Sequence, residues 1–497
     1  MATASEPNES VEPGIAAVIL LAAGGGTRMK SQTIKMLHEV AGRSLLAHVI
    51  NAVEDTRPER MLAVVGHQAD RVSEHLKQIA PAVETAYQAE QGGTGHAAQV
   101  GLEALGDLSG DVLVTITDMP LLTGEALVGL VEAHRNTGSV ATFLSATVAD
   151  PTGYGRIVRD GSGVVTGIVE HKDATDEQRT ITEINSGVGI FDAAVLRSLL
   201  PQLTPSGASG ELYLTDVPAL AVAAGHTIAA HRIDDAWQTE GVNTRVQLAA
   251  LGKELNRRIC ERWMLAGVTI VDPATTWIQA DVDLAPDVTL LPGTSLEGAT
   301  TIESGAVVGP DTTLTDVEVG ANATVTRTQA ELAVIGAGAD VGPFAYLRPG
   351  TVLAADGKIG TFVETKNAKI GKGAKVPHLT YAGDAEIGEG ANIGAGTIFA
   401  NYDGVDKHHS RVGRFSFIGS ESVLIAPVDV ADGAYVAAGS ALTDDVGVGE
   451  LGIARGRQHN SSGWVARNRS GTRTADAADE ADHGPEQSQN TDPTSRA

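Results

Sequence analysis

The stretch IQADVDLAPDVTLLPGTSLEGATTIESGAVV, residues 278–308, carries an aliphatic residue at every sixth position. Neither an α-helix, with its period of 3.6, nor an ordinary strand, with its period of 2, generates this spacing. A six-residue repeat is the signature of a parallel β-helix, in which each repeat supplies a short strand and a turn and its aliphatic side chain points inward. The pattern runs through Ile278, Leu284, Leu290, Leu296, Ile302, Val308 and Leu314, then Ile335, Val341, Leu347, Leu353 and Ile359, then Val412, Ile418, Leu424, Val430, Val436, Leu442 and Val448.

Three interruptions break this repeat. They contain TFVETKNAK (361–369), PHLTYAGD (377–384) and NYDGVDKHHS (401–410), which are rich in Lys, His, Tyr and Asn. A single interruption could be a tolerated surface loop. Three polar interruptions close together are instead candidates for function, because a solenoid stays regular where it only needs to stack.

The N-terminal half alternates short apolar runs with helical patterns, which predicts a doubly wound α/β domain with a mostly parallel sheet. Its ligands should lie at the carboxyl ends of the strands. We expect strands at 16–21, 61–65, 112–115 and 142–148, and helices at 44–54, 69–79, 96–105 and 125–134.

The order of these patterns predicts five segments. Thr244 and Gln247 fit a capping box, so a connecting helix should begin there. From Ser470 onward no aliphatic residue larger than Ala occurs, which is typical of a disordered acidic tail. We therefore expect a disordered leader at 1–14, an α/β domain at 15–244, a linker helix at 245–266, a β-helix at 267–469 and a disordered tail at 470–497.

Composition excludes several classes of protein. The formal charge of −26 argues against broad nucleic-acid binding, which needs clustered cations. No apolar run is long enough to span a bilayer, so no membrane insertion is expected. The polar N-terminus does not look like a signal peptide, and the single Cys260 excludes an internal disulfide framework. We expect a cytoplasmic protein in which Cys260 is a small buried apolar residue.

A glycine-rich loop, VILLAAGGGTRMKSQTIK (18–35), follows the first predicted strand. It lacks the third glycine of the dinucleotide fingerprint, and it has no Gly-Lys-Ser/Thr of a P-loop. Glycines here would let backbone N–H groups approach a phosphate closely.

The longer stretch LAAGGGTRMKSQTIKMLHEVAGRSLL resembles the signature of sugar-1-phosphate nucleotidyltransferases. Together with YQAEQGGTGHAAQ, PTGYGRI, EINSG, EGVN, GPFAYLRPGT, HLTYAGDAEIG and NIGAGTIFANYDG, it resembles the bacterial N-acetylglucosamine-1-phosphate uridyltransferase/glucosamine-1-phosphate acetyltransferase (GlmU) family from about Ala16 to Arg455. The resemblance implies a Rossmann-like nucleotidyltransferase domain, a left-handed β-helix and a homotrimer. It also implies acetyl-CoA and UTP as co-substrates, glucosamine 1-phosphate as the acceptor, and Mg²⁺ as cofactor.

The same resemblance assigns a nucleotidyl-transfer site. Arg28 and Lys35 match the cations that neutralise the triphosphate, and Asp118 and Asn243 match the metal pair, whose hard oxygens suit Mg²⁺. Taken alone, such charges are usually solvated, and an Asp after a strand is usually a turn or cap residue. The other matched positions are Leu21, Ala22, Ala23 and Gly24 in the loop, Gln88, Gly93 and Thr94 at the uracil, and Gly155, Glu170 and Asn185 at the sugar.

Two positions depart from the family pattern. Thr117 stands where the family usually has a glycine before the aspartate, and Ile34 stands where it usually has a proline before the lysine. Thr117 should crowd the nucleotide, and Ile34 removes a constraint on φ. Neither change deletes a charge, so we expect activity to survive, though weakened.

The second implied site lies in the interruptions of the repeat. His378 matches the family's catalytic base, and imidazole ordinarily titrates in the range that such a role needs. Taken alone, one of 14 histidines would more often be structural or solvated. The implied amino-sugar contacts are Arg348, Lys366, Tyr381 and Asn392, and the implied acetyl-CoA contacts are Ala395, Asn401, Tyr402, Ser420, Ala438 and Arg455.

Beyond Arg455 a basic run contains Trp464, which could stack on a coenzyme adenine or simply be part of a solvated extension. Two other functions remain open at this point. One is a single-activity nucleotidyltransferase with a structural β-helix, and the other is a non-catalytic trimeric scaffold that binds sugar nucleotides. The intact Arg28, Lys35, Asp118 and Asn243 disfavour the scaffold.

Overall fold

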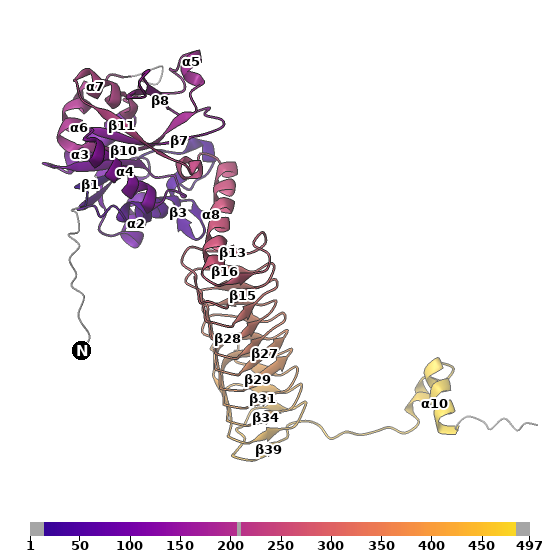
Figure 1. Ribbon diagram of the computed structural model, residues 1–497. Helices are drawn as coiled ribbons and strands as arrows, with labels where there is room; N and C mark the ends of the chain where they lie inside the picture. Colours follow the sequence, from indigo (N-terminus) through magenta and orange to yellow (C-terminus); the bar gives the residue numbers. More distant parts are fainter. Residues whose placement is uncertain (1–13, 206–209, 484–497) are drawn as a thin grey trace, which may run out of the picture.

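The computed structural model describes residues 14–205 and 210–483. An α/β domain sits at one end of a long β-helix, the helix α8 (Arg245–Leu265) joins the two, and a small helix pair lies beyond the last coil (Figure 1). The predicted fold class is confirmed. Of the predicted leader, all but Gly14 lies outside the described residues.

The α/β domain is built on a nine-stranded sheet with the central order β11-β7-β10-β6-β1-β4-β5. Only β10 runs antiparallel to its neighbours β6 and β7 in this path, and β8 and β9 form a hairpin at its side. The bounds are β1 Ala17–Ala22, β4 Arg60–Val65, β5 Glu84–Tyr87, β6 Asp111–Ile116, β7 Ala141–Thr147, β8 Arg156–Arg159, β9 Val165–Val169, β10 Glu183–Asp192 and β11 Ile228–Ile233. A separate hairpin pairs β2 (Glu39–Val40) with β3 (Arg43–Ser44).

Helices cover the sheet, and two separate apolar clusters pack against it. The four helices expected from the pattern are present. One of them, α3, begins at Thr94 rather than His96, directly after Gly93 with its positive φ of 98°. The helices are α1 Leu45–Glu54, α2 Ala69–Ile79, α3 Thr94–Ala104, α4 Gly124–Thr137, α5 Asp176–Arg179, α6 Ala193–Leu199 and α7 Val217–Ala223, with 3-10 turns η1 Thr27–Met29, η2 Lys35–Leu37, η3 Leu200–Gln202, η4 Leu214–Asp216 and η5 Ala236–Thr239.

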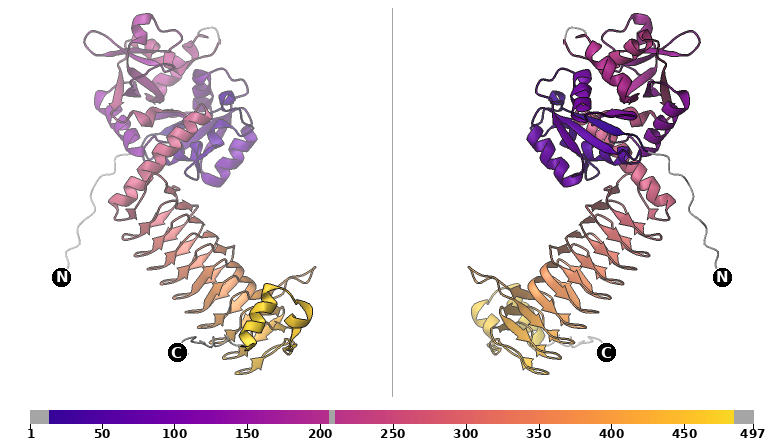
Figure 2. Two further views of the ribbon diagram at one scale, coloured as in Figure 1. Left: turned by 90° about the vertical axis from the view of Figure 1, so that its right-hand side faces the viewer. Right: turned by 90° about the vertical axis from the view of Figure 1, so that its left-hand side faces the viewer.

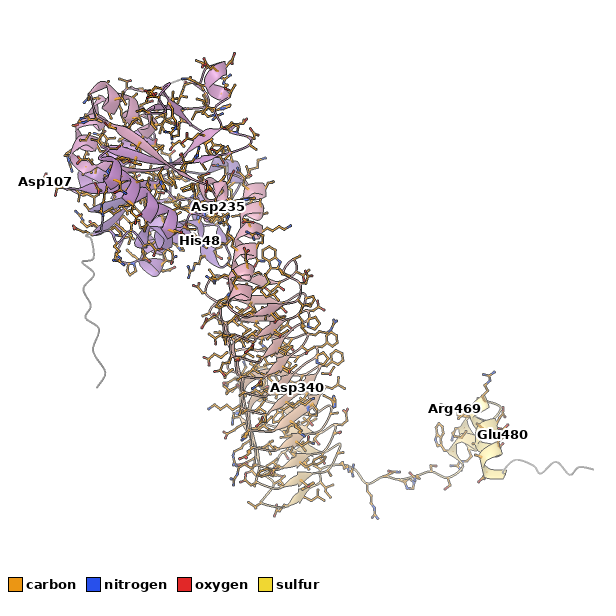
Figure 3. All side chains as sticks on the ribbon, viewed as in Figure 1. His48, Asp107, Asp235, Asp340, Arg469 and Glu480 are labelled. Atoms are coloured by element: carbon orange, nitrogen blue, oxygen red, sulfur yellow. The ribbon has the colours of Figure 1, made fainter. Side chains whose placement is uncertain are left out.

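Helix α8 begins at its expected cap. The hydroxyl of Thr244 accepts a hydrogen bond from the backbone N–H of Gln247 at 3.2 Å. The Gln247 side chain reaches one residue further back than in a capping box and accepts from the N–H of Asn243 at 3.0 Å. Arg258 of α8 pairs with Asp235 of the α/β domain at 2.7 Å, beside the helix in Figure 3.

The β-helix is a stack of triangular coils, seen from two sides in Figure 2. The aliphatic side chains of the repeat point inward and form one continuous core. Val448 is the exception among the predicted positions: it is 79 % exposed, and Val446 is buried in its place. One face contains β12 Thr269–Ile270, β15 Thr289–Leu290, β18 Val307–Val308, β21 Thr324–Val325, β24 Asp340–Val341, β27 Lys358–Thr361, β29 Lys375–His378, β31 Asn392–Ile393, β34 Phe417–Ile418, β37 Tyr435–Val436 and β39 Leu451–Gly452.

The other two faces join as one long sheet. Its strands are β13 Trp277–Ile278, β14 Asp283–Leu284, β16 Ser295–Glu297, β17 Thr301–Ile302, β19 Thr313–Thr315, β20 Glu318–Val319, β22 Gln329–Glu331, β23 Val334–Ile335, β25 Tyr346–Leu347, β26 Val352–Leu353, β28 Glu364–Ile370, β30 Tyr381–Ile387, β32 Ile398–Ala400, β33 Ser410–Val412, β35 Val423–Ile425, β36 Val428–Val430 and β38 Ala441–Leu442.

The three interruptions of the repeat differ in structure. The first two are not loops, because residues 364–370 and 381–387 form the long strands β28 and β30, which pair with each other in register. The third leaves the coil as a short loop, closed by a bridge between Tyr402 and Lys407. The polar residues of the first two interruptions are therefore held on a rigid sheet.

The C-terminal part differs from expectation in two ways. The last strand of the β-helix ends at Gly452, well before residue 469, and α9 (Trp464–Asn468) follows after an extended segment. The tail predicted as disordered forms α10 over Arg473–His483. The stretch is rich in Ala, the best helix former, and Thr472 caps its start by accepting from the N–H of Ala475 at 3.4 Å. Residues 484–497 lie outside the described part.

Within residues 14–205 and 210–483, no helix has the length and apolar character needed to cross a bilayer.

The inward and outward positions of one repeat should differ sharply in their effect on stability. Leu353 is fully buried, whereas its neighbour Val352 is 40 % exposed. We expect Leu353→Ala to lower the free energy of unfolding by about 2–5 kcal/mol, because it opens a cavity between coils. Val352→Ala is the matched control and should cost less than about 1 kcal/mol. Urea titrations followed by circular dichroism measure both, and equal losses would contradict the inward assignment.

Cys260 on α8 is fully buried, as expected from the sequence, and burial raises the pKa of its thiol to about 11. The thiolate is the reactive form, so almost none is present at pH 8. We expect an aromatic disulfide reagent at pH 8 to leave the folded protein unmodified and to react once per chain in denaturant. Rapid reaction of the folded protein would contradict this burial.

Candidate active sites

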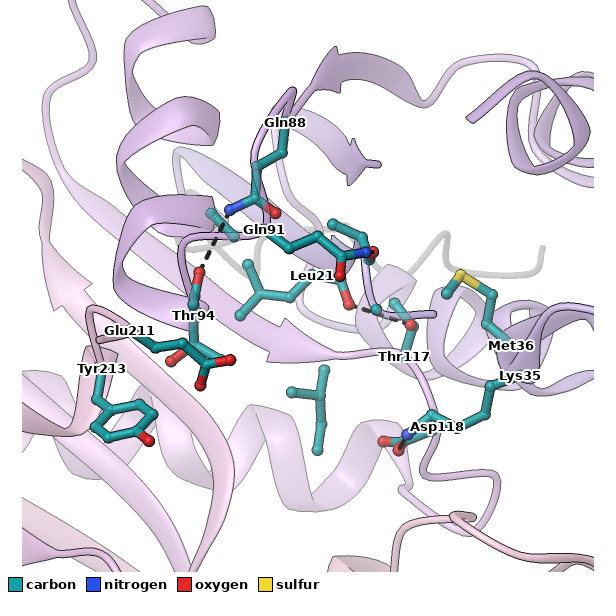
Figure 4. A pocket seen from close by; sticks show the side chains of 15 residues that line it. Leu21, Lys35, Met36, Gln88, Gln91, Thr94, Thr117, Asp118, Glu211 and Tyr213 are labelled. Atoms are coloured by element: carbon teal, nitrogen blue, oxygen red, sulfur yellow. Dashed lines mark hydrogen bonds and ion pairs between the residues drawn. The ribbon is translucent and has the colours of Figure 1, made fainter. Parts of the chain in front are cut away.

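The first candidate site lies at the carboxyl ends of β1 and β6, which are parallel neighbours with Leu21 opposite Ile116. The glycine loop leaves β1 and the Thr117–Asp118 segment leaves β6 at the same edge of the sheet. Between them is a cavity of about 300 Å³ (Figure 4). Its lining includes the predicted residues Leu21, Ala23, Gly24, Lys35, Gln88, Gly93, Thr94 and Asp118, together with Met36, Gln91, Ala97, Ile116, Thr117, Glu211 and Tyr213.

Four of the predicted polar residues converge at one end of this cavity. The Lys35 ammonium contacts the Asp118 carboxylate and also donates to Oδ1 of Asn243 at 3.2 Å. The Arg28 guanidinium donates to the same Oδ1 at 2.8 Å. Two cations thus share one carboxylate and one amide, which leaves an excess of positive charge suited to an anionic ligand.

The turn that carries Lys35 is closely packed. Gly26 has φ 60°, and a Cβ on it would lie 2.5 Å from Cβ of Lys35, so glycine is required there. A Cβ on Gly24 would meet no protein atom within 4 Å. Gly24 therefore leaves its backbone open to the cavity.

The two departures from the family pattern are accommodated. Ile34 adopts φ −62°, the value that proline would impose, and its side chain is buried in the core. The hydroxyl of Thr117 donates to the carbonyl of Leu21 at 3.2 Å, as the dashed line in Figure 4 shows. The threonine side chain is thus directed toward β1, next to the cavity.

Asp118 and Asn243 fit a hard divalent cation. Oδ1 of Asp118 is buried and has no hydrogen-bond partner within the described chain. Both residues offer oxygen, the donor that Mg²⁺ prefers. No cluster of three or more His, Cys, Asp or Glu suited to a metal occurs in the described part of the chain. A cation held here would therefore complete its shell with ligand phosphates and water.

The polar residues expected at a nucleobase lie across the cavity. The buried Gln88 side chain has its amide nitrogen 3.2 Å from Nδ1 of His96 and donates weakly to the Gly93 carbonyl at 3.4 Å. Gln91 donates to the carbonyl of Ala23 at 3.0 Å and so ties this segment to the glycine loop.

The three residues expected at the sugar also lie together. A Cβ on Gly155 would stand 3.6 Å from both Cβ of Asn185 and Oε1 of Glu170. Thr215 donates to that Glu170 oxygen at 2.8 Å and so fixes its orientation. Thr215 lies two residues after Tyr213, which lines the cavity.

A tyrosine links the sugar side to the charged centre. Tyr154 donates to Glu240 at 2.7 Å, and Glu240 lies three residues before Asn243. Burial, the hydrogen bond to Glu240 and the nearby Asp118 raise the pKa of Tyr154 far above its usual value. Tyr154 therefore stays protonated and can keep donating at any physiological pH.

The second candidate site lies on β28 and β30, the long strands that the first two interruptions of the repeat form. Pairing of β25, β28 and β30 brings Tyr346, Glu364 and Tyr381 into one row, and Arg348 pairs with Glu364 at 2.9 Å. Further along the same strands Lys366 lies opposite Gly383. A Cβ on Gly383 would lie 2.4 Å from the Tyr381 hydroxyl, so the glycine leaves room for that hydroxyl.

Two lysines face each other at this site. The ammonium of Lys407, from the projecting loop, lowers the pKa of Lys366. Two adjacent ammonium groups are unfavourable unless an anion lies between them, so this pair is a candidate phosphate contact.

The Asp384 carboxylate lies near Lys366 and Lys407 and offsets part of their positive charge. It accepts from Asn367 at 2.8 Å and from the buried Asn401 at 2.5 Å. Burial opposes ionisation of Asp384, but these two bonds and the charges of Lys366 and Lys407 together lower its pKa. The carboxylate therefore anchors the projecting loop to the strands that carry Lys366.

The predicted base and four of the six predicted coenzyme contacts follow one corner of the coils, whereas Asn401 and Tyr402 lie at the start of the projecting loop. His378 ends β29 with an exposed imidazole, which forms no hydrogen bond within the described chain, and its carbonyl accepts from the N–H of Gly396 in the next coil at 3.3 Å. From there the corner continues through hydrogen bonds that join Ala395 to Glu421, Ser420 to Gly439, and Ala438 to Arg455.

Comparison with known proteins decides the family. A family model described as a MobA-like NTP transferase domain matches residues 18–162. A bifunctional protein GlmU of Kineococcus radiotolerans is 56 % identical over 95 % of this chain and 96 % of its own. Those of Streptomyces avermitilis and Corynebacterium jeikeium are each 54 % identical, over 95 % and 94 % of this chain and 98 % and 96 % of their own. The chain belongs to the bifunctional GlmU family.

The structure brings most of the residues predicted from the sequence together at the two candidate sites. Ala22 is fully buried in β1 and does not line the cavity. Asn392 lies on β31 beside Lys375 and Phe417, on a different face from Lys366. Trp464 lies on the helix pair beyond the last coil, with the Arg469 guanidinium 5.1 Å from its ring centroid (Figure 1).

The prediction from sequence missed several residues that the structure places at the two candidate sites. Gln91 stands inside a motif already quoted, and Lys407 stands inside the third interruption, so both had a signal. Glu211, Tyr213 and Thr215 lie in a segment whose pattern carried none. Asp384 closes the second interruption, where a lone Asp in a turn is uninformative.

Proposed function

We propose that this chain makes UDP-N-acetylglucosamine in two steps at the two sites described above. The β-helix transfers an acetyl group from acetyl-CoA to glucosamine 1-phosphate. The α/β domain then transfers UMP from UTP to the N-acetylglucosamine 1-phosphate. The observation that carries the proposal is the convergence of Arg28, Lys35, Asp118 and Asn243 at the cavity, in a chain that belongs to the bifunctional GlmU family along nearly its whole length.

In uridyl transfer the phosphate oxygen of the sugar attacks the α-phosphorus of UTP. The bond between the α-phosphorus and the bridging oxygen breaks, and pyrophosphate leaves. Arg28 and Lys35 neutralise the negative charge on the phosphates, while Gln88 and the Gly93 backbone bind the base. Little covalent chemistry falls to the protein, so positioning and charge account for catalysis.

We further propose that Asp118 and Asn243 hold Mg²⁺. The buried, unpartnered Oδ1 of Asp118 supports this assignment. When bound, the ion would neutralise phosphate charge. Lys35 contacts Oδ2 of Asp118 and Oδ1 of Asn243, so its ammonium would lie next to a cation held by these two residues.

In acetyl transfer the amine of glucosamine 1-phosphate attacks the thioester carbonyl, and the carbon–sulfur bond breaks. The exposed His378 imidazole takes the proton that the amine loses. Arg348, Lys366 and Lys407 bind the sugar phosphate. The corner through Ala395, Ser420, Ala438 and Arg455 binds the coenzyme, whose phosphates the Arg455 side chain can reach.

We also propose a homotrimer in the cytoplasm, where UTP and acetyl-CoA are available. Exposed aromatic pairs on the β-helix support assembly. Phe344 stacks on Phe362 and Phe417 lies against Tyr435, each pair with ring centroids 5.5 Å apart, and all four rings are more than a third exposed. Such apolar surface is typical of a protein–protein interface.

Removing the carboxylate that Lys35 contacts should abolish only one activity. We expect Asp118→Asn to lower the rate of pyrophosphate release from UTP and N-acetylglucosamine 1-phosphate by at least about a hundredfold. Asn preserves shape but not charge, so the cation and Lys35 both lose their anionic partner. Release of coenzyme A thiol, measured on the same preparation, should not change. Equal losses in both assays would indicate general damage instead.

Removing the proposed base should have the opposite effect. We expect His378→Ala to slow acetyl transfer by about 10²–10⁴-fold and to leave uridyl transfer intact, because the two sites lie in different domains. His409 of the projecting loop, whose side chain is exposed like that of His378, provides the control. His409→Ala should retain much more acetyl transfer than His378→Ala. Undiminished acetylation in His378→Ala would show that the base is a different group.

A further inference from the structure

The hairpin β2–β3 projects from the α/β domain and rests on the first coil of the β-helix. The carbonyl of Ala41, in its turn, accepts from the N–H of Ala280 at 2.9 Å. Arg43 donates to Asp281 through Nε at 3.0 Å and through a second, closer nitrogen. Gly42 lies so near Gln279 that a Cβ on it would stand 2.3 Å from Oε1. The contact is therefore close, with both backbone and side-chain components.

The same hairpin is continuous with the turn that carries Lys35. Residues 35–37 form η2, and the N–H of His38 donates to the Lys35 carbonyl at 3.2 Å. The N–H of Leu45, just beyond the hairpin, donates back to the His38 carbonyl at 3.0 Å. These short bonded connections leave little freedom between the hairpin tip and Lys35.

The hairpin β2–β3 is thus one arm between the first coil and the charged centre, the hairpin arm. Helix α8 is a second arm, the α8 arm, which joins the first coil to Asn243. Asn243 immediately precedes the cap of α8, and its N–H is held by Gln247. Further along α8 the buried Asn256 donates to the Thr276 carbonyl at 2.8 Å and accepts from the Ile278 N–H at 2.9 Å. The Asn256 side chain thus satisfies two backbone groups of the first coil, the Thr276 carbonyl and the Ile278 N–H. It fixes α8 against that coil.

Apolar packing joins the two arms. A small cluster of Met29, Val40, Leu45, Leu121, Val242 and Leu251 draws together the Lys35 loop, the hairpin, the segment after Asp118 and helix α8. Ala41 and Leu255 pack against this cluster and also against the core of the β-helix. Apolar contact is therefore unbroken from the β-helix to the charged centre.

We propose that residues 276–281, one repeat within the first coil of the β-helix, are a positioning platform for uridyl transfer. It holds the hairpin arm and the α8 arm at a fixed separation, and so it sets the distance between Lys35 and Asn243 at the transferring phosphate. The proposal rests on the proposed function of the α/β domain. Arg43, Asp281 and Asn256 act through Lys35 and Asn243 and are positioning residues.

An exchange of charges across the hairpin contact tests the platform. Arg43→Asp places two carboxylates face to face, and Asp281→Arg places two guanidinium groups face to face. We expect each single variant to lower kcat for uridyl transfer at least threefold with the KM for UTP changed less than twofold, because spacing at the reacting phosphate is lost while nucleotide contacts remain. The double variant Arg43→Asp/Asp281→Arg should recover at least half of the original kcat.

Two controls for the charge exchange are available in the same protein. Acetyl transfer takes place many coils away and should be unchanged in all three variants. Asp311 pairs with Arg327 at 2.9 Å elsewhere on the β-helix, so Asp311→Arg matches the charge change without touching either arm. It should leave both activities intact.

The other arm supplies an independent variant. Asn256→Ala removes both bonds to the first coil and should also lower kcat for uridyl transfer and spare acetyl transfer. If it unfolds the protein, the charge exchange still decides the question.

Three results would overturn the platform: single variants that change neither activity, single variants that lower both activities equally, or a double variant no better than the single ones. Failure of the proposed function is distinguishable, because unmodified protein would then release no pyrophosphate from UTP and N-acetylglucosamine 1-phosphate.

Discussion

The contact of the Lys35 ammonium with Asp118 and Asn243 is the interaction on which the α/β domain is organised. The three residues come from the glycine loop, from the end of β6 and from the start of α8, far apart in the sequence. Each is brought there by a different constraint: a positive φ at Gly26, the parallel pairing of β1 with β6, and the cap of α8 at Thr244. The lysine neutralises a carboxylate that would otherwise be buried without a counter-ion, which is costly in a protein interior.

The two sites use the same physical means in different architectures. Each contains a cluster of two cations and one carboxylate: Arg28 and Lys35 with Asp118, and Lys366 and Lys407 with Asp384. In the α/β domain loops at a sheet edge supply these groups, whereas in the β-helix they stand on the strands β28 and β30 and on one loop. A chain with a large negative formal charge can therefore handle anionic substrates by concentrating positive charge locally.

Much of this arrangement could be predicted from the sequence, because periodicity and motif spacing depend on local rules. The six-residue repeat predicts the coils, because each short strand of a coil needs one aliphatic side chain that points into the core. Long motifs identify Lys35, Asp118 and His378. Residues such as Thr215 and Asp384 could not be found in this way, because they act by orienting a neighbour that only tertiary structure brings near. The helix at 473–483 was missed because its composition is equally typical of a disordered acidic tail; high alanine content and a threonine cap favour helix without leaving an aliphatic pattern.

The stacked coils have a further consequence for how the intermediate travels. Successive coils repeat at the spacing of paired strands, about 4.8 Å, and glycines such as Gly394 and Gly419 bring neighbouring coils so close that a Cβ would lie 2.4 or 2.3 Å from the next amide nitrogen. A column packed in this way cannot bend to bring its two ends together. The acetylated sugar phosphate must therefore diffuse through the surrounding water to reach the nucleotide centre, and the number of coils between the centres could change in whole steps during evolution without altering the chemistry of either one.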